Sequence, residues 1–174
     1  MGGGGRTATN VAAVHILIGA DADYVVNDVK AALGGPDVSF VVCRNGRAVT
    51  QAVRDRQPDL AVLDLQIGSM GAMAVTMGLR LDESSGLLPH VKVLMLLDRK
   101  ADVHLAKRCG AEEWLVKPVD ALTLKRAARR VLGVAATAKP LVSAAPARRW
   151  KAVEGPTEVD DAGTTSEEEA ASAG

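Results

Sequence analysis

The stretch Pro58-Asp59-Leu60-Ala61-Val62-Leu63-Asp64 carries the strongest structural signal in this chain. An apolar run that follows a proline is typical of a β-strand buried on both faces, as in a parallel sheet. Its last residue, Asp64, would then lie at the carboxyl edge of the sheet, where ligands bind in open α/β folds. The alternative is that Asp64 only caps a turn, because aspartate is frequent where strands end.

Strand-like and helix-like segments alternate along the chain on both sides of this stretch. The predicted strands are residues 11–18, 38–43, 58–64, 91–97 and 114–116, and the predicted helices are residues 24–33, 45–56, 72–81, 101–109 and 121–132. Breakers such as Gly34-Gly35-Pro36 separate them. Strict alternation predicts an α/β fold: a doubly wound, five-stranded parallel sheet with helices on both faces, in three layers α/β/α.

The composition changes at both ends of the chain. Residues 1–10 are rich in glycine and threonine and are expected to be disordered, residues 11–133 form the predicted domain, and residues 134–174 form an Ala/Pro/Glu-rich tail that is also expected to be disordered. Within the tail, Arg148-Arg149-Trp150-Lys151 is either a docking motif or a solvated charge cluster. The tail ends in acidic residues and lacks helical periodicity, which argues against direct DNA binding.

The overall composition excludes several classes of protein. With 174 residues, of which 48% are hydrophobic, the chain can hold one ordinary domain and a tail. A formal net charge of zero gives no reason to expect nucleic acid or an anionic membrane as a partner. No apolar run approaches the ~18 residues of a membrane span, and no signal peptide is recognisable, so we expect a cytoplasmic protein. Cys43 and Cys109 lack the spacing of a zinc site and are expected to be reduced thiols.

Charged residues follow several of the predicted strands. Asp21 and Asp23 follow the first strand, Asp64 ends the third, and Lys117 follows the fifth. Because parallel strands share one carboxyl end, we expect these side chains to converge at one edge. Each also has a simpler interpretation, since the acids after the first strand can cap a helix and the lysine can be merely exposed.

Two motifs carry a family resemblance. They are Asp64-Leu65-Gln66-Ile67-Gly68-Ser69-Met70-Gly71 and Gly110-Ala111-Glu112-Glu113-Trp114-Leu115-Val116-Lys117-Pro118. Together with the order of elements, they resemble the receiver domain of two-component response regulators, which has a flavodoxin-like fold, over residues 14–132. The resemblance implies that Asp64 accepts a phosphoryl group from a histidine kinase and that Lys117 contacts the phosphoryl oxygens. It also implies a Mg²⁺ ion held by Asp21, Asp64 and the backbone carbonyl of Gln66.

The sequence departs from the family pattern at two positions of the site. Receivers usually carry two adjacent acids after the first strand, but alignment places Ala20 and Asp21 there, with Asp23 as a substitute only if the alignment shifts. Weaker Mg²⁺ binding is expected, because the charge of the ligands sets affinity. At the end of the fourth strand, Leu97 replaces the usual threonine or serine. Trp114 occupies the aromatic switch position, or is simply an aromatic residue at the sheet edge.

Three functions remain open from the sequence. The first is a receiver that signals through protein contacts, with no enzymatic turnover beyond self-phosphorylation and self-dephosphorylation at Asp64. The second is a receiver-like adaptor that works without phosphorylation. In both cases a downstream partner would bind the face formed by helix 101–109, strand 114–116 and helix 121–132, and a homodimer is left open. The basic residues of the last helix, Lys125, Arg126, Arg129 and Arg130, either face an acidic partner or are solvated.

The third function is that of a phosphatase. Asp21-Ala22-Asp23-Tyr24-Val25 matches the short nucleophile motif of haloacid-dehalogenase-like phosphatases, in which Asp21 would attack and Asp23 would act as general acid. The chain lacks a convincing late acidic metal pair, and its folded part is small for that class.

Overall fold

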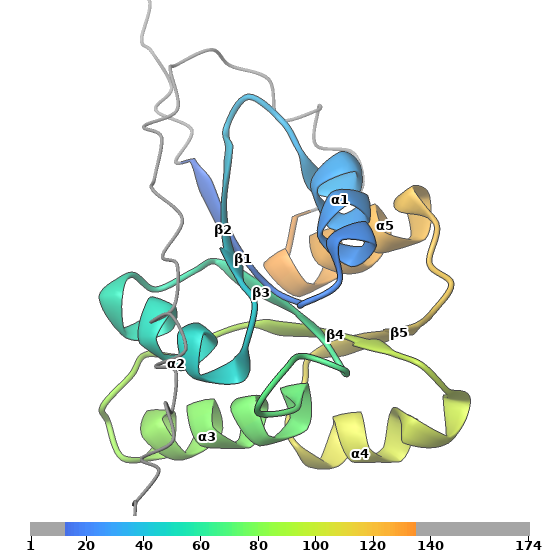
Figure 1. Ribbon diagram of the computed structural model, residues 1–174. Coiled ribbons are helices and arrows are strands. Elements are labelled where there is room, and N and C mark those ends of the chain that lie inside the picture. The colour runs from blue at the N-terminus through green and yellow to red at the C-terminus, as the bar shows by residue number, and fades with distance from the viewer. Residues whose placement is uncertain (1–12, 135–174) are drawn as a thin grey trace, which may run out of the picture.

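Five parallel strands in the order β2-β1-β3-β4-β5 form the central sheet of the computed structural model, which describes residues 13–134 (Figure 1). The strands are β1 (Val14–Gly19), β2 (Val38–Cys43), β3 (Leu60–Asp64), β4 (Val93–Leu97) and β5 (Glu113–Val116). The helices are α1 (Asp23–Leu33), α2 (Gly46–Asp55), α3 (Ala72–Ser84), α4 (Val103–Arg108) and α5 (Ala121–Leu132), and a 3₁₀ turn (Lys100–Asp102) precedes α4. The predicted fold is confirmed. The predicted disorder of residues 1–10 and of the tail from residue 135 onward lies outside the described residues.

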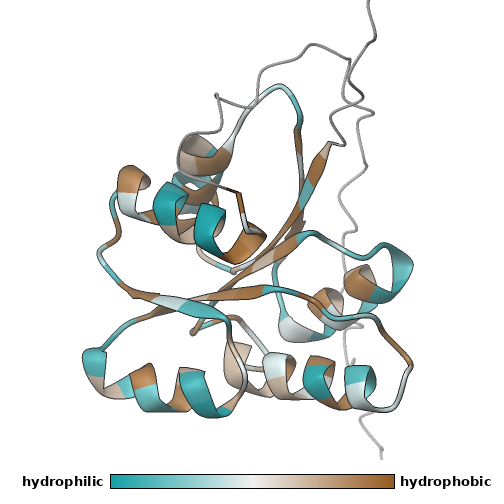
Figure 2. Ribbon diagram, turned by 180° about the vertical axis from the view of Figure 1, so that it is seen from behind, coloured by the Kyte–Doolittle hydropathy of each residue, from teal (hydrophilic) through white to brown (hydrophobic). Residues whose placement is uncertain are grey.

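Helices α1 and α5 cover one face of the sheet, and α2, α3 and α4 cover the other (Figure 1). Successive strand residues point to opposite faces, so each strand feeds both cores. In β4, Val93, Met95 and Leu97 belong to the core under α2, α3 and α4, whereas Leu94 and Leu96 belong to the core under α1 and α5. Figure 2 shows largely hydrophobic strands between helices that are hydrophobic on only part of their surface. This pattern is typical of a parallel sheet buried on both faces.

β3 lies in the middle of the sheet, between β1 and β4, and all five of its residues are buried. Asp59, just before the strand, accepts the backbone N–H of His15 at 2.7 Å through its carboxylate and donates its own N–H to the His15 carbonyl at 2.8 Å. At the other end, Asp64 is paired in register with Leu96 of β4. β3 therefore brings Asp64 to the carboxyl edge of the sheet, between the ends of its two neighbours.

Most predicted boundaries are close to the observed ones, and two coincide with them. Strand 38–43 and helix 121–132 are found as predicted. The predicted strand 11–18 forms a strand only from Val14, and residues 11 and 12 lie outside the described residues. Strand pairing begins two residues later than predicted in β3 and β4, and the start of helix 101–109 is a 3₁₀ turn.

The predicted end of helix 72–81 was wrong, because α3 continues to Ser84. The sequence predicts a polar turn over residues 82–89. In the structure, Asp82 pairs with Arg54 of α2 at 3.0 Å, and Glu83 pairs with Arg80 at 2.6 Å. These ion pairs, one of them long-range, stabilise the additional turn of helix.

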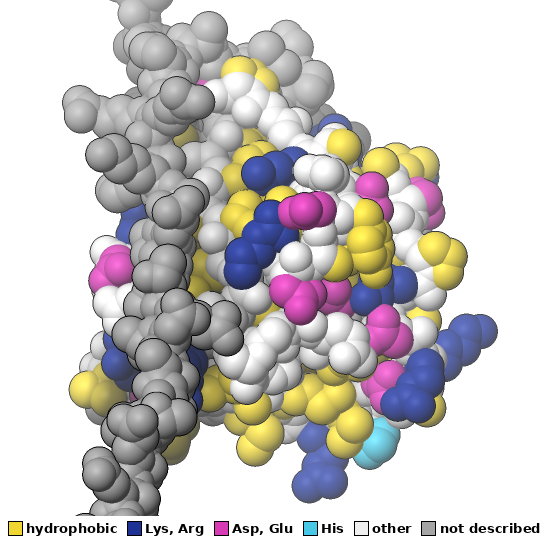
Figure 3. Space-filling model, in the orientation of Figure 1, with side chains coloured by type: hydrophobic (Ala, Val, Ile, Leu, Met, Phe, Trp, Pro, Cys, Tyr) yellow, Lys and Arg dark blue, Asp and Glu magenta, His cyan; other side chains and the backbone are white. Residues whose placement is uncertain are grey.

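α3 also exposes apolar side chains to solvent. Met77 is 61% exposed and Leu81 is 66% exposed. Figure 3 shows hydrophobic side chains along the lower edge of the molecule, where α3 lies in Figure 1. Exposed apolar residues of this kind are common on folded domains, so they support no functional assignment by themselves.

Arg80 ties α3 to the two segments that lead into β4 and β5. Its guanidinium donates to the carbonyl of Gly110 at 2.7 and 2.9 Å and to that of Val91 at 3.0 Å. It also pairs with Glu83 at 2.6 Å and with Glu112 at 2.7 Å. Gly110 has a φ of 83°, and a Cβ there would lie only 3.1 Å from Arg80 Nε, so this position favours glycine. The fork geometry of arginine lets one side chain serve all four acceptor groups.

We predict that Arg80→Met lowers the free energy of unfolding by about 2 to 4 kcal/mol, because two carbonyls and two carboxylates each lose one donor. The control Arg54→Met removes a single ion pair, that with Asp82, which is more exposed to solvent. This substitution should lower the free energy of unfolding by less than about 1 kcal/mol. Urea unfolding at pH 7 measures both variants. Equal losses would contradict the role assigned to Arg80.

Candidate functional site at the carboxyl edge of the sheet

Asp64 and Lys117 form an ion pair at the carboxyl edge of the sheet. Asp64 is 2% exposed, and Lys117 follows β5 directly. Lys117 Nζ lies 2.8 Å from Asp64 Oδ1, and the backbone N–H of Gln66 points to the same oxygen at 3.4 Å. A carboxylate so deeply buried needs such partners, because burying an unpaired charge is costly. The two residues are 53 positions apart in the sequence, and the shared strand edge brings them together as predicted.

A second carboxylate, that of Asp98, shares the same lysine. Asp98 follows β4, and its Oδ1 lies 2.8 Å from Lys117 Nζ. This hydrogen bond, reinforced by one from the Gln66 side chain, holds the pKa of Asp98 below its ordinary value. Burial alone would lower the pKa of Lys117, but the hydrogen bonds and charges of Asp64 and Asp98 outweigh burial and raise it. Lys117 is therefore positively charged and bridges the ends of β3 and β4.

The two acids after β1 point in different directions. Asp21 faces the loop after β3, since its Oδ2 lies 3.6 Å from the point where a Cβ on Gly68 would be. The side chain of Asp23, the first residue of α1, is 81% exposed and pairs with Arg44 at 2.5 Å. Arg44 also donates to the backbone carbonyl of Asp21 at 2.8 Å. Of the two acids, Asp21 is the one that faces the loop carrying Gln66.

The loop after β3 is held by the loop after β2. The N–H of Gly46 donates to the carbonyl of Gly68 at 3.1 Å, and Asn45 forms an isolated parallel bridge with Gly68. A Cβ on Gly46 would lie 2.5 Å from the carbonyl oxygen of Met70, so only glycine permits this close approach. These contacts position the backbone around Gln66 next to the end of β1.

The sequence profile of the response regulator receiver domain family matches residues 16–129. The chain belongs to this family. Its receiver domain is 29% identical over 120 residues to the transcriptional regulatory protein CseB of Streptomyces avermitilis, covering 68% of this chain and 48% of CseB. It is 27% identical over 118 residues to protein PilH of Pseudomonas aeruginosa, covering 68% of this chain and 97% of PilH. The matched region thus spans about half of the length of CseB and nearly all of PilH.

Solved receiver domains share the fold of this chain. The receiver domain of the sensor histidine kinase PA1611 from Pseudomonas aeruginosa PAO1 aligns with a TM-score of 0.61 at 18% sequence identity. The alignment covers 70% of this chain and 99% of that domain. The crystal structure of the PA1611 domain has a magnesium ion coordinated in its active site cleft. Receiver domains are in general signalling domains rather than enzymes.

Two positions around the site of this receiver domain are apolar and fully buried. Ala20 is 0% exposed and packs in the core under α1 and α5, so it offers no carboxylate. Leu97 is also 0% exposed and packs in the other core, against which Trp114 lies partly buried. Lys107 of α4 lies 5.2 Å from the centroid of the Trp114 ring, a cation–π contact. Trp114 is therefore restrained from the α4 side.

The oxygen donors at the edge fit a magnesium ion with few protein ligands. Mg²⁺ is bound by one or two carboxylates together with water and phosphate oxygens, and Asp21 and Asp64 provide two carboxylates. Within residues 13–134, no group of three His, Cys, Asp or Glu side chains is arranged to hold a metal ion. The donor chemistry therefore suits Mg²⁺, and the low number of acids suits weak binding.

Sequence reasoning missed two charged residues of the edge, Asp98 and Arg44. Both follow strands directly or closely, Arg44 after β2 and Asp98 after β4. The rule that placed Asp21, Asp64 and Lys117 at the carboxyl edge applies to them equally. Their place at this edge is therefore predictable from the sequence, although neither residue belongs to the family pattern.

The phosphatase alternative is wrong for this chain. It requires Asp21 and Asp23 to act together, whereas the side chain of Asp23 is turned toward Arg44. Membership of the receiver family replaces this interpretation.

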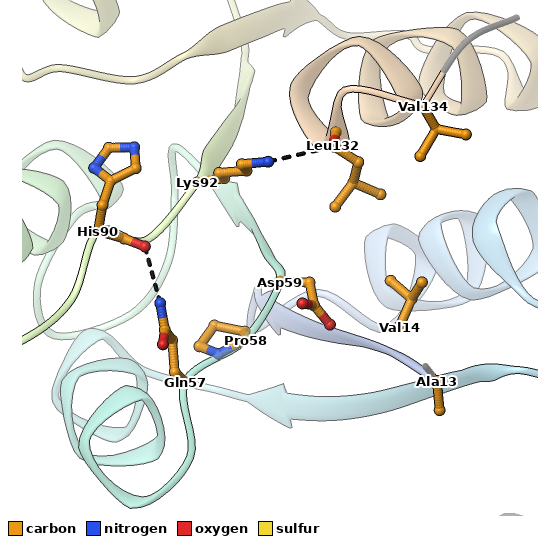
Figure 4. A pocket seen from close by; sticks show the side chains of 9 residues that line it. All are labelled: Ala13, Val14, Gln57, Pro58, Asp59, His90, Lys92, Leu132 and Val134. Carbon is orange, nitrogen blue, oxygen red and sulfur yellow. Dashed lines mark hydrogen bonds between the residues drawn. The ribbon is translucent and has the colours of Figure 1, made fainter. Parts of the chain in front are cut away.

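A hollow of about 390 Å³ lies at the opposite edge of the sheet, at the amino ends of β1, β3 and β4 (Figure 4). Gln57 donates to the carbonyl of His90 at 3.0 Å, and Lys92 donates to that of Leu132 at 3.3 Å. These contacts link the segments that precede β3 and β4 to one another and to α5. The hollow is remote from Asp64. The candidate site is therefore identified by the charged side chains at the carboxyl edge, and not by the volume of a cavity.

The two cysteines are buried free thiols, in agreement with the expected reduced state. Burial raises the pKa of Cys43 to about 11, which keeps it protonated and unreactive at neutral pH. Among the helices of residues 13–134, none is both long enough and apolar enough to span a membrane.

The Lys117 bridge predicts a pH dependence of stability. Because Lys117 holds the pKa of Asp98 below its ordinary value of 3.8, the bridge stabilises the fold above that pH and is lost as the pH falls through the lowered pKa. We predict that Lys117→Met is less stable than the wild type at pH 7, and that this difference shrinks as the pH falls below 3.8. Urea unfolding over this range measures it, and a difference independent of pH would contradict the prediction.

Proposed function

We propose that this receiver domain accepts a phosphoryl group on Asp64 from a histidine kinase. The observation that supports the proposal most strongly is a nearly buried carboxylate at the sheet edge, paired at 2.8 Å with Lys117. In the step, a carboxylate oxygen of Asp64 bonds to phosphorus while the P–N bond of the phosphohistidine breaks. The imidazole leaves with the bonding electron pair. The chain catalyses no turnover beyond the gain and loss of this phosphoryl group.

Lys117 and the neighbouring backbone would orient the reacting groups. The ammonium already contacts Oδ1 of Asp64, and a phosphoryl group on Asp64 would come within its reach. Asp21, Asp64 and the carbonyl of Gln66 would hold a Mg²⁺ ion, which when bound would neutralise charge on the phosphoryl oxygens.

We further propose that a downstream partner binds the face formed by α4, β5 and α5. On α5, Leu122 and Arg126 lie four residues apart and are both exposed, so they share one side of the helix, whereas Lys125 lines a hollow beside β1 and the end of α1. The amphipathic pattern of residues 121–132 predicts that Leu122 packs inward with the apolar side of the helix, but Leu122 is 56% exposed. Arg130 is paired with Glu113 of β5 at 3.0 Å, so the charge of one of the four basic residues of α5 is already neutralised. The surface therefore combines an exposed apolar residue with positive charges, one of which is already paired with an acid.

We also propose a domain boundary near residue 133 and a cytoplasmic location, and two further features support them. Gly133 adopts a φ of 76° directly after α5, which supports the end of the domain near residue 133. The buried free thiols of Cys43 and Cys109 support a reducing compartment, the cytoplasm.

A second candidate function is an adaptor that works without phosphorylation. It is favoured by Leu97, which is buried in the core and has no hydroxyl to move, and by Trp114, which Lys107 restrains at 5.2 Å. For such an adaptor, Asp64→Asn would leave the affinity for its partner unchanged. For a phosphorylation-dependent receiver, the wild-type affinity changes on phosphorylation and that of Asp64→Asn does not.

We predict that incubation of the full chain with radiolabelled acetyl phosphate and Mg²⁺ labels the wild type, and that Asp64→Asn abolishes the label. The matched control is Asp59→Asn, which lies five residues earlier at the opposite edge and retains an oxygen that can accept the His15 N–H. It should be labelled like the wild type. Labelling of Asp64→Asn, or no labelling of the wild type, would contradict the proposed function.

We also predict that Asp21→Asn weakens Mg²⁺ binding about tenfold, because the charge of the ligands sets affinity. The same substitution at Asp23, whose carboxylate is occupied by Arg44, should change the affinity less than about twofold. Titration with Mg²⁺ followed by NMR chemical shifts measures both variants. An equal or larger effect at Asp23 would show that the wrong acid has been assigned.

A further inference from the structure

Asp98 is a charged residue of the site to which the proposed function assigns no role. It follows Leu97, which is fully buried at the end of β4, and its side chain is 34% exposed. The neighbouring Arg99 does not neutralise it by direct contact, because the guanidinium of Arg99 pairs with Asp102 at 3.2 Å. The direct partners of the Asp98 carboxylate are Lys117 and the side chain of Gln66.

The two carboxylates of the bridge are close to one another. The oxygens of Asp64 and Asp98 each lie 2.8 Å from the same Nζ atom of Lys117, so they are separated by at most twice that distance. Gln66 also contacts both acids, Asp64 through its backbone N–H and Asp98 through its side chain. A change of charge on Asp64 is therefore felt directly by Asp98.

Phosphorylation of Asp64 makes this arrangement electrostatically unfavourable. The carboxylate carries one negative charge, whereas an acyl phosphate carries nearly two near neutral pH. The added oxygens would compete with Asp98 for the donors of Lys117, and the charge of Asp98 would repel them. At a partly exposed site, repulsion between charges at such a distance corresponds to about a tenfold change in an equilibrium constant.

We propose that Asp98 is a positioning residue that holds Lys117 and Gln66 through its carboxylate and thereby limits how readily Asp64 becomes phosphorylated. This inference rests on the proposed function of Asp64. It assigns a limit on the phosphorylation of Asp64 to one negative charge at the end of β4. Neutralising that charge releases Lys117 to the phosphoryl group.

The test is a series of substitutions at Asp98 in the full chain, with radiolabelled acetyl phosphate and Mg²⁺. In the reaction an oxygen of Asp64 bonds to phosphorus, the P–O bond of acetyl phosphate breaks, and acetate leaves with the electron pair. Asp98→Asn and Asp98→Ala should both raise the initial rate and the final extent of labelling by about tenfold. Asp98→Glu keeps the charge and should stay within about twofold of the wild type. Asp28→Asn, at an exposed position of α1, controls for the change in net charge.

A second measurement does not depend on phosphorylation. Titration of the Lys117 ammonium followed by NMR should show a lower pKa in Asp98→Asn than in the wild type, because one of the carboxylates that raise it is gone. Asp98→Glu should restore the pKa. An unchanged pKa of Lys117 in Asp98→Asn would show that Asp98 does not act on the lysine and would overturn the inference.

The outcomes separate the two proposals. More label in Asp98→Asn and Asp98→Ala, with unchanged controls, supports the inference, including the case in which the wild type is barely labelled. Equal labelling of the wild type and all Asp98 variants overturns the inference and leaves Asp64 as the phosphoacceptor. No label in any protein overturns the proposed function, and the inference fails with it.

Discussion

The ion pair between Lys117 and the buried Asp64 is the interaction on which the carboxyl edge of this domain depends. It joins the ends of β3 and β5 across the end of β4, so the sheet order brings both residues to one place. A carboxylate that is 2% exposed is tolerated there only because a cation and a backbone N–H reach it. The need to pair Asp64 fixes the direction of the Lys117 side chain, and in this direction the ammonium also contacts Asp98.

The electrostatics of the edge set this domain apart from the family pattern. Where receivers usually offer a hydroxyl at the end of the fourth strand, this chain buries Leu97 and then places a carboxylate, Asp98, against the lysine. The edge thus has an additional hydrogen-bond acceptor near the Asp64 carboxylate in place of a donor. After β1, negative charge is lost instead of gained, because Ala20 stands where the family usually has an acid and Arg44 pairs with Asp23. Both changes leave Asp64 and Lys117 paired and alter the charge around them.

Much of the fold could be predicted from the sequence, because the relevant signals are local. The continuous apolar run of β3 and the breakers between segments specify a parallel sheet, and the edge rule then places Asp64 with Lys117. The features that could not be predicted from the sequence are ion pairs between residues far apart in the chain. Arg44, which follows β2, engages the carboxylate of Asp23, and α3 gains its last turn partly through Arg54 of α2. The sharing of Lys117 by two acids depends on side-chain directions that no local pattern encodes.

The most direct test of this account identifies the phosphorylated residue itself. Borohydride reduces an acyl phosphate to an alcohol and converts a phosphorylated aspartate into homoserine, which mass spectrometry of the digested protein locates. After phosphorylation with a histidine kinase and Mg²⁺, the account predicts homoserine at position 64. Homoserine at position 21 or 98, or at none of the acidic positions of the edge, would contradict it.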